Sequence, residues 1–150
     1  VKYVPWMCLR LRDSIPGTRA NYILSIEGMF KQLFIAYGCS ITWFTVACRP
    51  ILFIDSCHLT AYYRGVLMSV CALDANNGLY PLTYSFASSE NDDDWLWFFQ
   101  ELKHIVGLEM KCSKVYYKIW YPQYQPMMSQ VWESYQSLQF QTTWDKVTAL

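Results

Sequence analysis

The residue best suited to do chemistry is a carboxylate that closes an apolar run. Pro50 is followed by four unbroken apolar residues, Ile51–Ile54, and the run ends in Asp55. Such a run is typical of a strand that is buried on both faces. A charged residue closing the strand would lie at its carboxyl end, the edge where α/β sheets gather their ligands. Asp55 is therefore the candidate functional carboxylate, and a turn-forming residue that simply ends the strand is the alternative.

Other acidic residues gather in the middle of the chain. Residues 1–49 hold six basic and two acidic groups, residues 50–110 hold two basic and eight acidic groups, and the remainder holds four basic and two. The formal net charge is zero, which argues against a stand-alone nucleic-acid binder. An acidic middle is a place for divalent-metal chemistry. Solvated carboxylates at the start of a helix are the alternative interpretation of the run Asp92–Asp94.

The cysteines give no metal or disulfide pattern. No pair has the two-residue spacing of a zinc knuckle, and His58 directly follows Cys57 instead of standing one helical turn away. We interpret the six cysteines as reduced, buried thiols. A nucleophile arrangement of Cys57, His58 and Asp55 is the alternative, although catalytic partners are usually brought together by the fold and not by adjacency.

Length and composition suit one globular domain. The 150 residues are 53% hydrophobic, 18% aromatic and only 16% charged, which excludes a disordered chain. No basic start and apolar segment mark secretion. The longest uncharged stretch, Gln32–Cys48, is interrupted by polar residues, so we expect no membrane span. The chain lacks an initiating Met, and we expect a fragment of a longer reading frame.

The first half of the chain contains three predicted segments before the apolar run. Residues 1–27 are polar, with few periodic apolar positions, and are expected to be an irregular basic lead-in. Phe30–Tyr37 alternates loosely and is rich in aromatic and β-branched residues, which predicts a strand. Ser40–Ala47 predicts one short helix.

A hairpin is predicted after the apolar run. Arg64–Leu73 and Leu79–Ala87 predict two strands, and the Asn77-Gly78 pair between them is the strongest short hairpin signal in a sequence. The two strands should therefore be antiparallel neighbours. Asp74 belongs to the turn, and we assign it a structural role.

A helix with one apolar stripe is predicted next. Ser89 or Asn91 can cap it, and Gly107 closes it. The stripe that would pack on the sheet consists of Trp95, Phe98, Phe99, Leu102 and Ile105. From Lys114 to Leu150 the chain has no Gly and is rich in aromatic residues and Gln, and only Met128–Leu138 suggests a helix.

Several motifs occur in a specific order between Phe30 and about Glu109. They are Phe30–Gly38, Cys48-Arg49-Pro50, Asp55–Leu59, Gly65-Val66-Leu67, Ala72–Leu82, Ser89-Glu90-Asn91, and Trp95 with Trp97, Phe98 and Phe99. In this order and spacing, the segment resembles the transposase domain of plant Mutator-like elements (MULE), a group related to the far-red-response transcription regulators.

The resemblance implies an α/β fold of the RNase H-like, DDE transposase type. Such domains cut and join DNA, so the implied partner is DNA, at transposon ends and target sites, and the implied location is the nucleus. Asp55 matches the first catalytic, metal-binding carboxylate, and two Mg²⁺ or Mn²⁺ ions about 4 Å apart are the implied cofactor. His58 also matches a family position, and we expect it to pack or form hydrogen bonds.

Departures from the family pattern bear on activity. Ser56 and Ala61 stand where the family usually has Gly, and Thr60 stands where it usually has Lys. The second carboxylate, in a Ser-Asp-Arg type motif after a fourth strand, is absent, and neither Glu133 nor Asp145 has the context of the third. We therefore expect a three-stranded first half plus a helix, truncated or divergent after about residue 113, without transposase activity and without tight metal binding.

The expected organisation has three parts. They are an irregular basic lead-in at residues 1–27, a partial MULE transposase domain at 28–113, and a divergent tail at 114–150. Our hypothesis for the tail is a truncated gene, a frameshift or an aberrant exon. Without a fourth strand, Ile51–Asp55 would present an open edge, prone to self-association unless Tyr116–Trp120 pairs there; the aromatic tail could also self-associate. An alternative function is a non-catalytic DNA-binding or transcription-regulatory fragment that meets DNA through its basic lead-in, around Arg10, Arg12 and Arg19.

Overall fold

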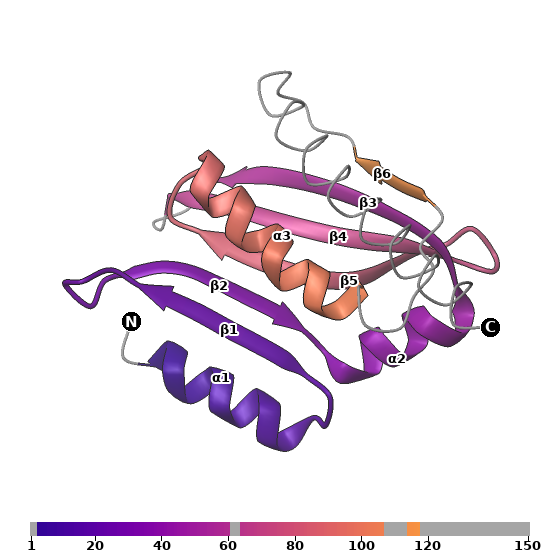
Figure 1. Ribbon diagram of the computed structural model, residues 1–150, viewed down its shortest axis with the longest axis horizontal. Helices are drawn as coiled ribbons and strands as arrows, with labels where there is room; N and C mark the ends of the chain where they lie inside the picture. Colours follow the sequence, from indigo (N-terminus) through magenta and orange to yellow (C-terminus); the bar gives the residue numbers. More distant parts are fainter. Residues whose placement is uncertain (1–2, 61–63, 107–113, 118–150) are drawn as a thin grey trace, which may run out of the picture. The chain divides into compact units, whose positions relative to one another are not determined.

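A computed structural model describes residues 3–60, 64–106 and 114–117, all within the first of the chain's two units, residues 1–118. The described residues form three helices and six strands (Figure 1). In chain order these are α1 (Tyr3–Ser14), β1 (Arg19–Leu24), β2 (Phe30–Ala36), α2 (Gly38–Ala47), β3 (Cys48–Leu59), β4 (Gly65–Asp74), β5 (Leu79–Ala87), α3 (Asp92–Val106) and β6 (Lys114–Tyr117).

One mixed sheet holds all six strands in the order β1-β2-β5-β4-β3-β6. Neighbours from β1 to β3 are antiparallel, whereas β6 runs parallel to β3, with Ile51 opposite Lys114 and Ile54 opposite Tyr117. The α/β class is confirmed, and the three expected strands and the helix correspond to β3, β4, β5 and α3, but the sheet holds more strands than expected. The sheet is extended by β1 and β2 beyond β5, and β6 covers the edge of β3 that we expected to be open.

The predicted pairing segment, Tyr116–Trp120, overlaps β6 only in part. β6 begins at Lys114 and is described to Tyr117, while residues 118–120 lie outside the described residues. The bounds of β6 differ from the predicted ones because pairing at a strand edge uses backbone N–H and C=O groups. A short segment can therefore add to the edge whatever its side chains. The helix suggested at Met128–Leu138 also lies outside the described residues.

The first 27 residues are not the irregular lead-in that we predicted. They hold α1 and β1, and α1 buries one stripe at helical spacing against β1 and β2: Val4, Met7, Cys8 and Leu11 pack with Ala20, Leu33 and Ile35. The stripe was obscured in the sequence because Tyr3, Trp6 and Leu9, on the other sides of the helix, are also apolar and yet exposed.

The opposite face of the sheet is covered by α3 (Figure 1). The predicted apolar stripe is confirmed: Trp95, Phe98, Phe99, Leu102 and Ile105 are all buried. Phe98 meets Phe34 of β2 with ring centroids 5.9 Å apart. Asn91 caps the helix, since its side-chain oxygen accepts a hydrogen bond from the Asp94 backbone N–H at 2.9 Å. Gly107, the predicted end, lies outside the described residues.

Two further predicted elements are confirmed. The strand expected at Phe30–Tyr37 is β2, and the helix expected at Ser40–Ala47 is α2, which begins two residues earlier at Gly38. Both elements lie between β1 and β3 in the chain, so they lead directly into the strand that carries Asp55.

The β4–β5 hairpin is organised by Asp74, whose predicted structural role is confirmed. Its Oδ1 accepts hydrogen bonds from the backbone N–H groups of Asn76 at 2.8 Å and Gly78 at 2.7 Å. Asn77 adopts the left-handed conformation at φ 64° that this turn requires. The aspartate therefore fixes the turn that keeps β4 and β5 in register.

Replacing this aspartate tests its role. Asp74→Ala should lower the free energy of unfolding by about 1 kcal/mol, because two backbone N–H groups lose their intramolecular acceptor and turn to water. Urea unfolding followed by tryptophan fluorescence measures the change. Asn76→Ala is the matched control, since it alters the same turn and keeps both bonds to Asp74, and an equal loss in the two variants would contradict the assigned role.

Candidate functional site

Asp55 lies in the middle of β3 and not at its carboxyl end as predicted. β3 continues to Leu59 because Ser56–Leu59 pair with Met68–Gly65 of the long strand β4. Alternation along the strand places Leu52 and Ile54, both 1% exposed, toward α3. Asp55 therefore points to the opposite face, where its side chain is exposed.

The surroundings of Asp55 are sparse. Its Oδ1 accepts a hydrogen bond from the backbone N–H of Ser56 at 2.9 Å, and Ser69 lies opposite it on β4. Burial raises the pKa of the Cys71 thiol on the same face, and the negative charge of Asp55 raises it further. Asp55 therefore has a hydrogen bond with the backbone of Ser56 and an electrostatic effect on the Cys71 thiol.

A second carboxylate lies on the α3 face of the same strand. Glu90, with a side chain only 7% exposed, lies 3.3 Å from His58, measured from Oε2 to Nε2. Its Oε1 accepts a hydrogen bond from the hydroxyl of Ser56 at 3.0 Å. Since Ser56 and His58 alternate with Asp55 along β3, Glu90 and Asp55 lie on opposite faces of the sheet. Sequence reasoning assigned Glu90 no role in a site, and no local pattern marks its burial.

The acidic run at the start of α3 does not form one group. Asp92 and Asp93 are exposed, as the interpretation of solvated carboxylates expects, but Asp94 is fully buried. Asp94 Oδ2 accepts hydrogen bonds from Ser89 Oγ at 3.0 Å and from Asn91 Nδ2 at 2.9 Å. This carboxylate therefore belongs to the polar network that begins the helix.

These residues do not fit a two-metal centre. In-line attack at a phosphate requires carboxylates that hold two cations about 4 Å apart. Within residues 3–60, 64–106 and 114–117, no group of three or more His, Cys, Asp or Glu side chains could hold a metal ion. Asp55 and Glu90 are separated by the sheet itself, so Asp55 would offer a cation one carboxylate and water.

One continuous segment, from β3 to β6, carries Asp55, the turn formed around Asp74, and Glu90 with its partners Ser56 and His58. Residues 51–117 match the family model of the MULE transposase domain. The match supports the predicted resemblance to a transposase of Mutator-like elements. A plant origin and the relation to the far-red-response regulators stay predictions. No curated protein and no solved structure matches the chain.

The MULE match and the predicted resemblance cover different ranges. The match begins at Ile51, so α1, β1, β2 and α2 lie outside it, whereas the resemblance began at Phe30. The match extends through β6, past Glu109, where the predicted resemblance ends. The segment from 114 to 117, which we assigned to the divergent tail, therefore continues the matched region. No helix in the described part of the chain is long and apolar enough to cross a membrane.

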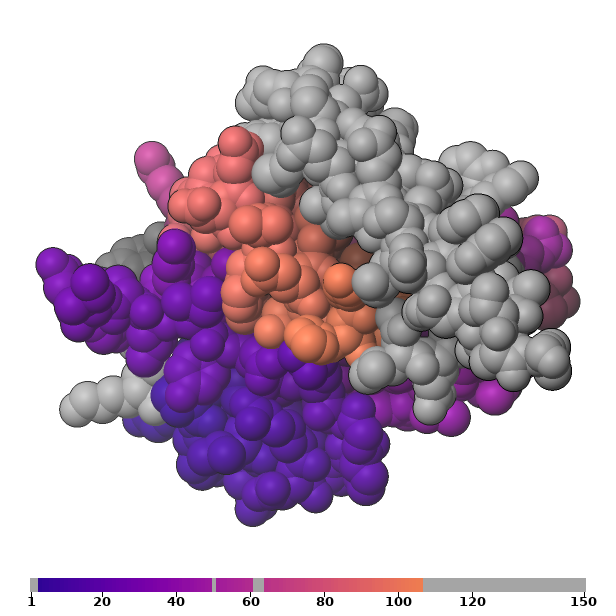
Figure 2. Space-filling view, viewed as in Figure 1, coloured from indigo at the N-terminus to yellow at the C-terminus, as the bar shows by residue number. Residues whose placement is uncertain are grey.

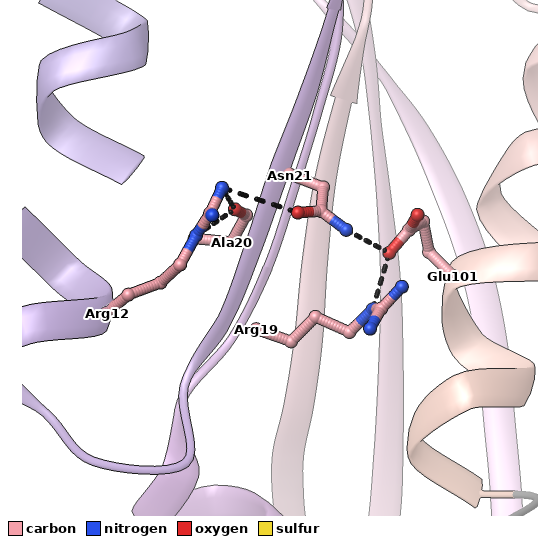
Figure 3. Close-up of polar contacts among 5 residues, drawn as sticks. All are labelled: Arg12, Arg19, Ala20, Asn21 and Glu101. Atoms are coloured by element: carbon pink, nitrogen blue, oxygen red, sulfur yellow. Dashed lines mark hydrogen bonds and ion pairs between the residues drawn. The ribbon is translucent and has the colours of Figure 1, made fainter. Parts of the chain in front are cut away.

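Two of the three arginines expected to meet DNA precede the MULE match and are held in a polar network with residues of β1 and α3 (Figure 3). Arg12 donates from Nε and Nη2 to the Ala20 carbonyl oxygen, at 2.9 and 2.6 Å. Arg19 Nε donates to Glu101 Oε2 of α3 at 2.6 Å. Asn21 joins the two, accepting from Arg12 at 3.4 Å and donating to Glu101 at 2.8 Å.

Three thiols link stability to pH. Burial raises the pKa of Cys8, Cys48 and Cys71 above 9.0, with a further raising effect of Asp74 on Cys48 and a lowering effect of Arg12 on Cys8. A raised pKa keeps the folded thiol protonated while the unfolded thiol ionises, so its stabilising contribution is complete below about pH 8.5 and is lost at higher pH.

Stability should consequently fall between about pH 8.5 and 10. Urea unfolding across this interval should give a smaller decline for a Cys8→Ala, Cys48→Ala, Cys71→Ala variant than for the original chain. The prediction that all six cysteines are buried is wrong for Cys39 and Cys57, which are exposed. Both remain in the two proteins as an internal control. Parallel declines would show that these three thiols do not contribute.

Proposed function

We propose that this chain is the DNA-binding part of a DDE-type transposase of the Mutator-like group and does not itself cut DNA. The observation that carries the proposal is the setting of Asp55. It lies on the strand flanked by β4 and β5 on one side and by the parallel β6 on the other, yet it is the lone carboxylate that the described part of β3 presents on its face.

The strand order supports an RNase H-like assignment. In that fold the first strand is central, with the second and third strands on one side and the fourth parallel to it on the other. β3, β4, β5 and β6 follow this order, and α3 follows β5 in the chain as the helix of that fold does. β1 and β2 extend the sheet beyond β5.

The residues that follow β6 support the absence of cleavage. A second carboxylate would be expected after the fourth strand, but the chain continues as Lys118-Ile119-Trp120. The acidic residues beyond that point are Glu133 and Asp145, far from the position the family uses. Mg²⁺ or Mn²⁺ would therefore bind weakly at Asp55, because hard cations need several oxygen ligands.

A combined binding and cleavage assay tests the proposal. We expect the chain to retard a labelled DNA duplex in a gel, with an affinity that falls as salt rises, and to leave the strands uncut with Mg²⁺ or Mn²⁺. Asp55→Ala should bind DNA as tightly as the original chain. Metal-dependent cuts that Asp55→Ala abolishes would overturn the absence of cleavage, and no retardation at low salt would overturn the DNA-binding role.

The same DNA binding would serve a transcription-regulatory fragment, the other function that the resemblance implies. Either role places the chain in the nucleus. A fluorescent fusion tests the location, and a reporter gene that carries the bound DNA sequence distinguishes a regulator from a component of transposition.

A further inference from the structure

A hollow of about 490 Å³ lies where α1, β1, α2 and α3 meet. α1, β1 and α2 precede the segment that matches the MULE domain, whereas α3 belongs to it. Figure 2 shows the indigo surface of the first elements directly beside the orange end of α3. The hollow is lined by Arg12, Gly17, Thr18, Arg19, Ala20, Asn21, Ile41, Thr45, His104 and Ile105. Cavities of this size hold ligands of about a nucleotide's dimensions.

Arg19 presents unused donors to this hollow. Its Nε is bound to Glu101 Oε2 at 2.6 Å, which fixes the plane of the guanidinium group (Figure 3). Its two Nη groups have no hydrogen-bond acceptor among the described residues. Glu101 is held by Asn21 as well, so the two Nη groups of Arg19 are positioned before any ligand arrives. This lowers the entropic cost of binding.

Arg12 supplies the net positive charge. Its partners are a carbonyl oxygen of Ala20 and an amide oxygen of Asn21, both neutral, so nothing in the network cancels its charge. Its Nη1 has no hydrogen-bond acceptor in the described part of the chain. Arg12, Arg19 and Glu101 together leave one formal positive charge beside the hollow, and a guanidinium group matches the geometry of a phosphate.

The rest of the lining is apolar or hydroxylic. Ile41 of α2 and Ile105 of α3 offer an apolar wall, and Ile105 is 7% exposed. Thr45 lies at the border, with its hydroxyl donating to the Thr42 carbonyl oxygen at 2.7 Å. A sugar or base could pack on the apolar wall while its phosphate meets the arginines.

We propose that this hollow binds one phosphate-bearing nucleotide unit of a DNA strand. The phosphate is held by the Nη groups of Arg19 and Arg12, and the sugar or base lies against Ile41 and Ile105. The inference rests on the proposed DNA-binding function and assigns it a location. The phosphate contact would thus lie on α1 and β1, which precede the MULE match, while Ile105 would come from α3 within it.

A charge placed at the border of the hollow tests the inference without disturbing the arginine network. Thr45 is exposed, so Thr45→Glu should fold normally while its negative charge repels a phosphate. Thr45→Gln introduces a side chain of the same size as glutamate but without the charge. Val46→Glu, at a neighbouring position that is 72% exposed and does not line the hollow, carries the same charge on the same helix as a control.

Two ligands are titrated into the complete chain, thymidine monophosphate by calorimetry and a single-stranded oligonucleotide by fluorescence anisotropy. Thr45→Glu should weaken both about tenfold, whereas Thr45→Gln and Val46→Glu should change them less than about twofold. The slope of log affinity against log salt for the oligonucleotide should fall by about 0.7 in Thr45→Glu, as expected for one lost phosphate contact.

The two ligands separate failure of this inference from failure of the proposed function. Equal affinities of Thr45→Glu and Val46→Glu for both ligands would overturn the inference, and DNA binding that persists in both would leave the proposed function standing. No binding of the monophosphate by the original chain would also overturn it. Monophosphate binding that Thr45→Glu weakens, without any oligonucleotide binding, would support the phosphate site and overturn DNA as its ligand.

Discussion

Phe98→Ala is expected to lower the free energy of unfolding by about 3–5 kcal/mol, close to the whole stability of many domains. Phe98 is fully buried between α3 and the sheet. Its ring centroid lies 5.9 Å from that of Phe34, 5.7 Å from that of Trp95 and 5.4 Å from that of Phe99. Truncation would leave a cavity among rigid rings, which cannot collapse to fill it.

Urea unfolding followed by circular dichroism measures this loss. Leu96→Ala is the matched control, because Leu96 lies two residues away on the same helix and is 44% exposed, so its loss should stay below about 1 kcal/mol. Similar losses in the two variants would mean that α3 does not hold the sheet through Phe98. If Phe98→Ala does not fold, Phe98→Leu should give an intermediate loss that can still be measured.

The elements predicted correctly are those whose signal is local. The stripe of α3 repeats at helical spacing within one segment, and its partner is a plain apolar sheet face. The β4–β5 hairpin depends on Asn77 and on an Asp74 side chain that bonds its own turn. Neither feature depends on a residue far away in the chain, so the sequence pattern was sufficient.

β1 could not be predicted because its polar residues depend on a distant partner. Arg19 and Asn21 alternate with Ala20 and would place polar side chains on a face that packs against α3. Both bond Glu101, about 80 positions later. Only the fold brings this carboxylate to the strand, so a local reading assigned the arginines to solvent and to DNA.

The site was half predictable for a similar reason. The residue type and apolar run identified Asp55, and alternation along a strand could have told that Asp55 and Ser56 face opposite sides. The length of β3 is set by its pairing with β4 as far as Leu59 opposite Gly65, and this moves Asp55 from the end of the strand to its middle. Burial of Glu90 beneath His58 likewise depends on how the β5–α3 connection returns to β3.

Two different regions of one sheet therefore bear on function. The matched segment carries Asp55, and the positively charged hollow is formed by α1, β1 and α2 together with the end of α3. Asp55 does not line the hollow, so the proposed loss of carboxylates would leave this positively charged surface in place. Under the proposed function, DNA contact would persist without cleavage, which is why the binding and cleavage measurements must be made separately.

Gly38→Ala should be the most damaging change for the hollow, with a loss of about 2–3 kcal/mol in unfolding free energy and a fall in affinity for thymidine monophosphate. A Cβ on Gly38 would collide with the Pro16 carbonyl oxygen and lie 2.8 Å from the Gly17 carbonyl carbon. The Gly38 N–H also donates to Thr18 Oγ1 at 3.0 Å. Because Gly17 and Thr18 line the hollow, relief of this collision must move its wall.

Gly28→Ala separates this steric effect from a loss of glycine as such. Gly28 adopts φ 75° but would place its Cβ in open space, with nothing within 4 Å, so only backbone strain of about 1 kcal/mol is expected. Monophosphate affinity should be unchanged in this variant, because the β1–β2 turn contributes no residue to the hollow. Gly38→Ala with the original affinity, alongside a measured loss of stability, would mean that the α2 junction supports the fold and not the binding surface.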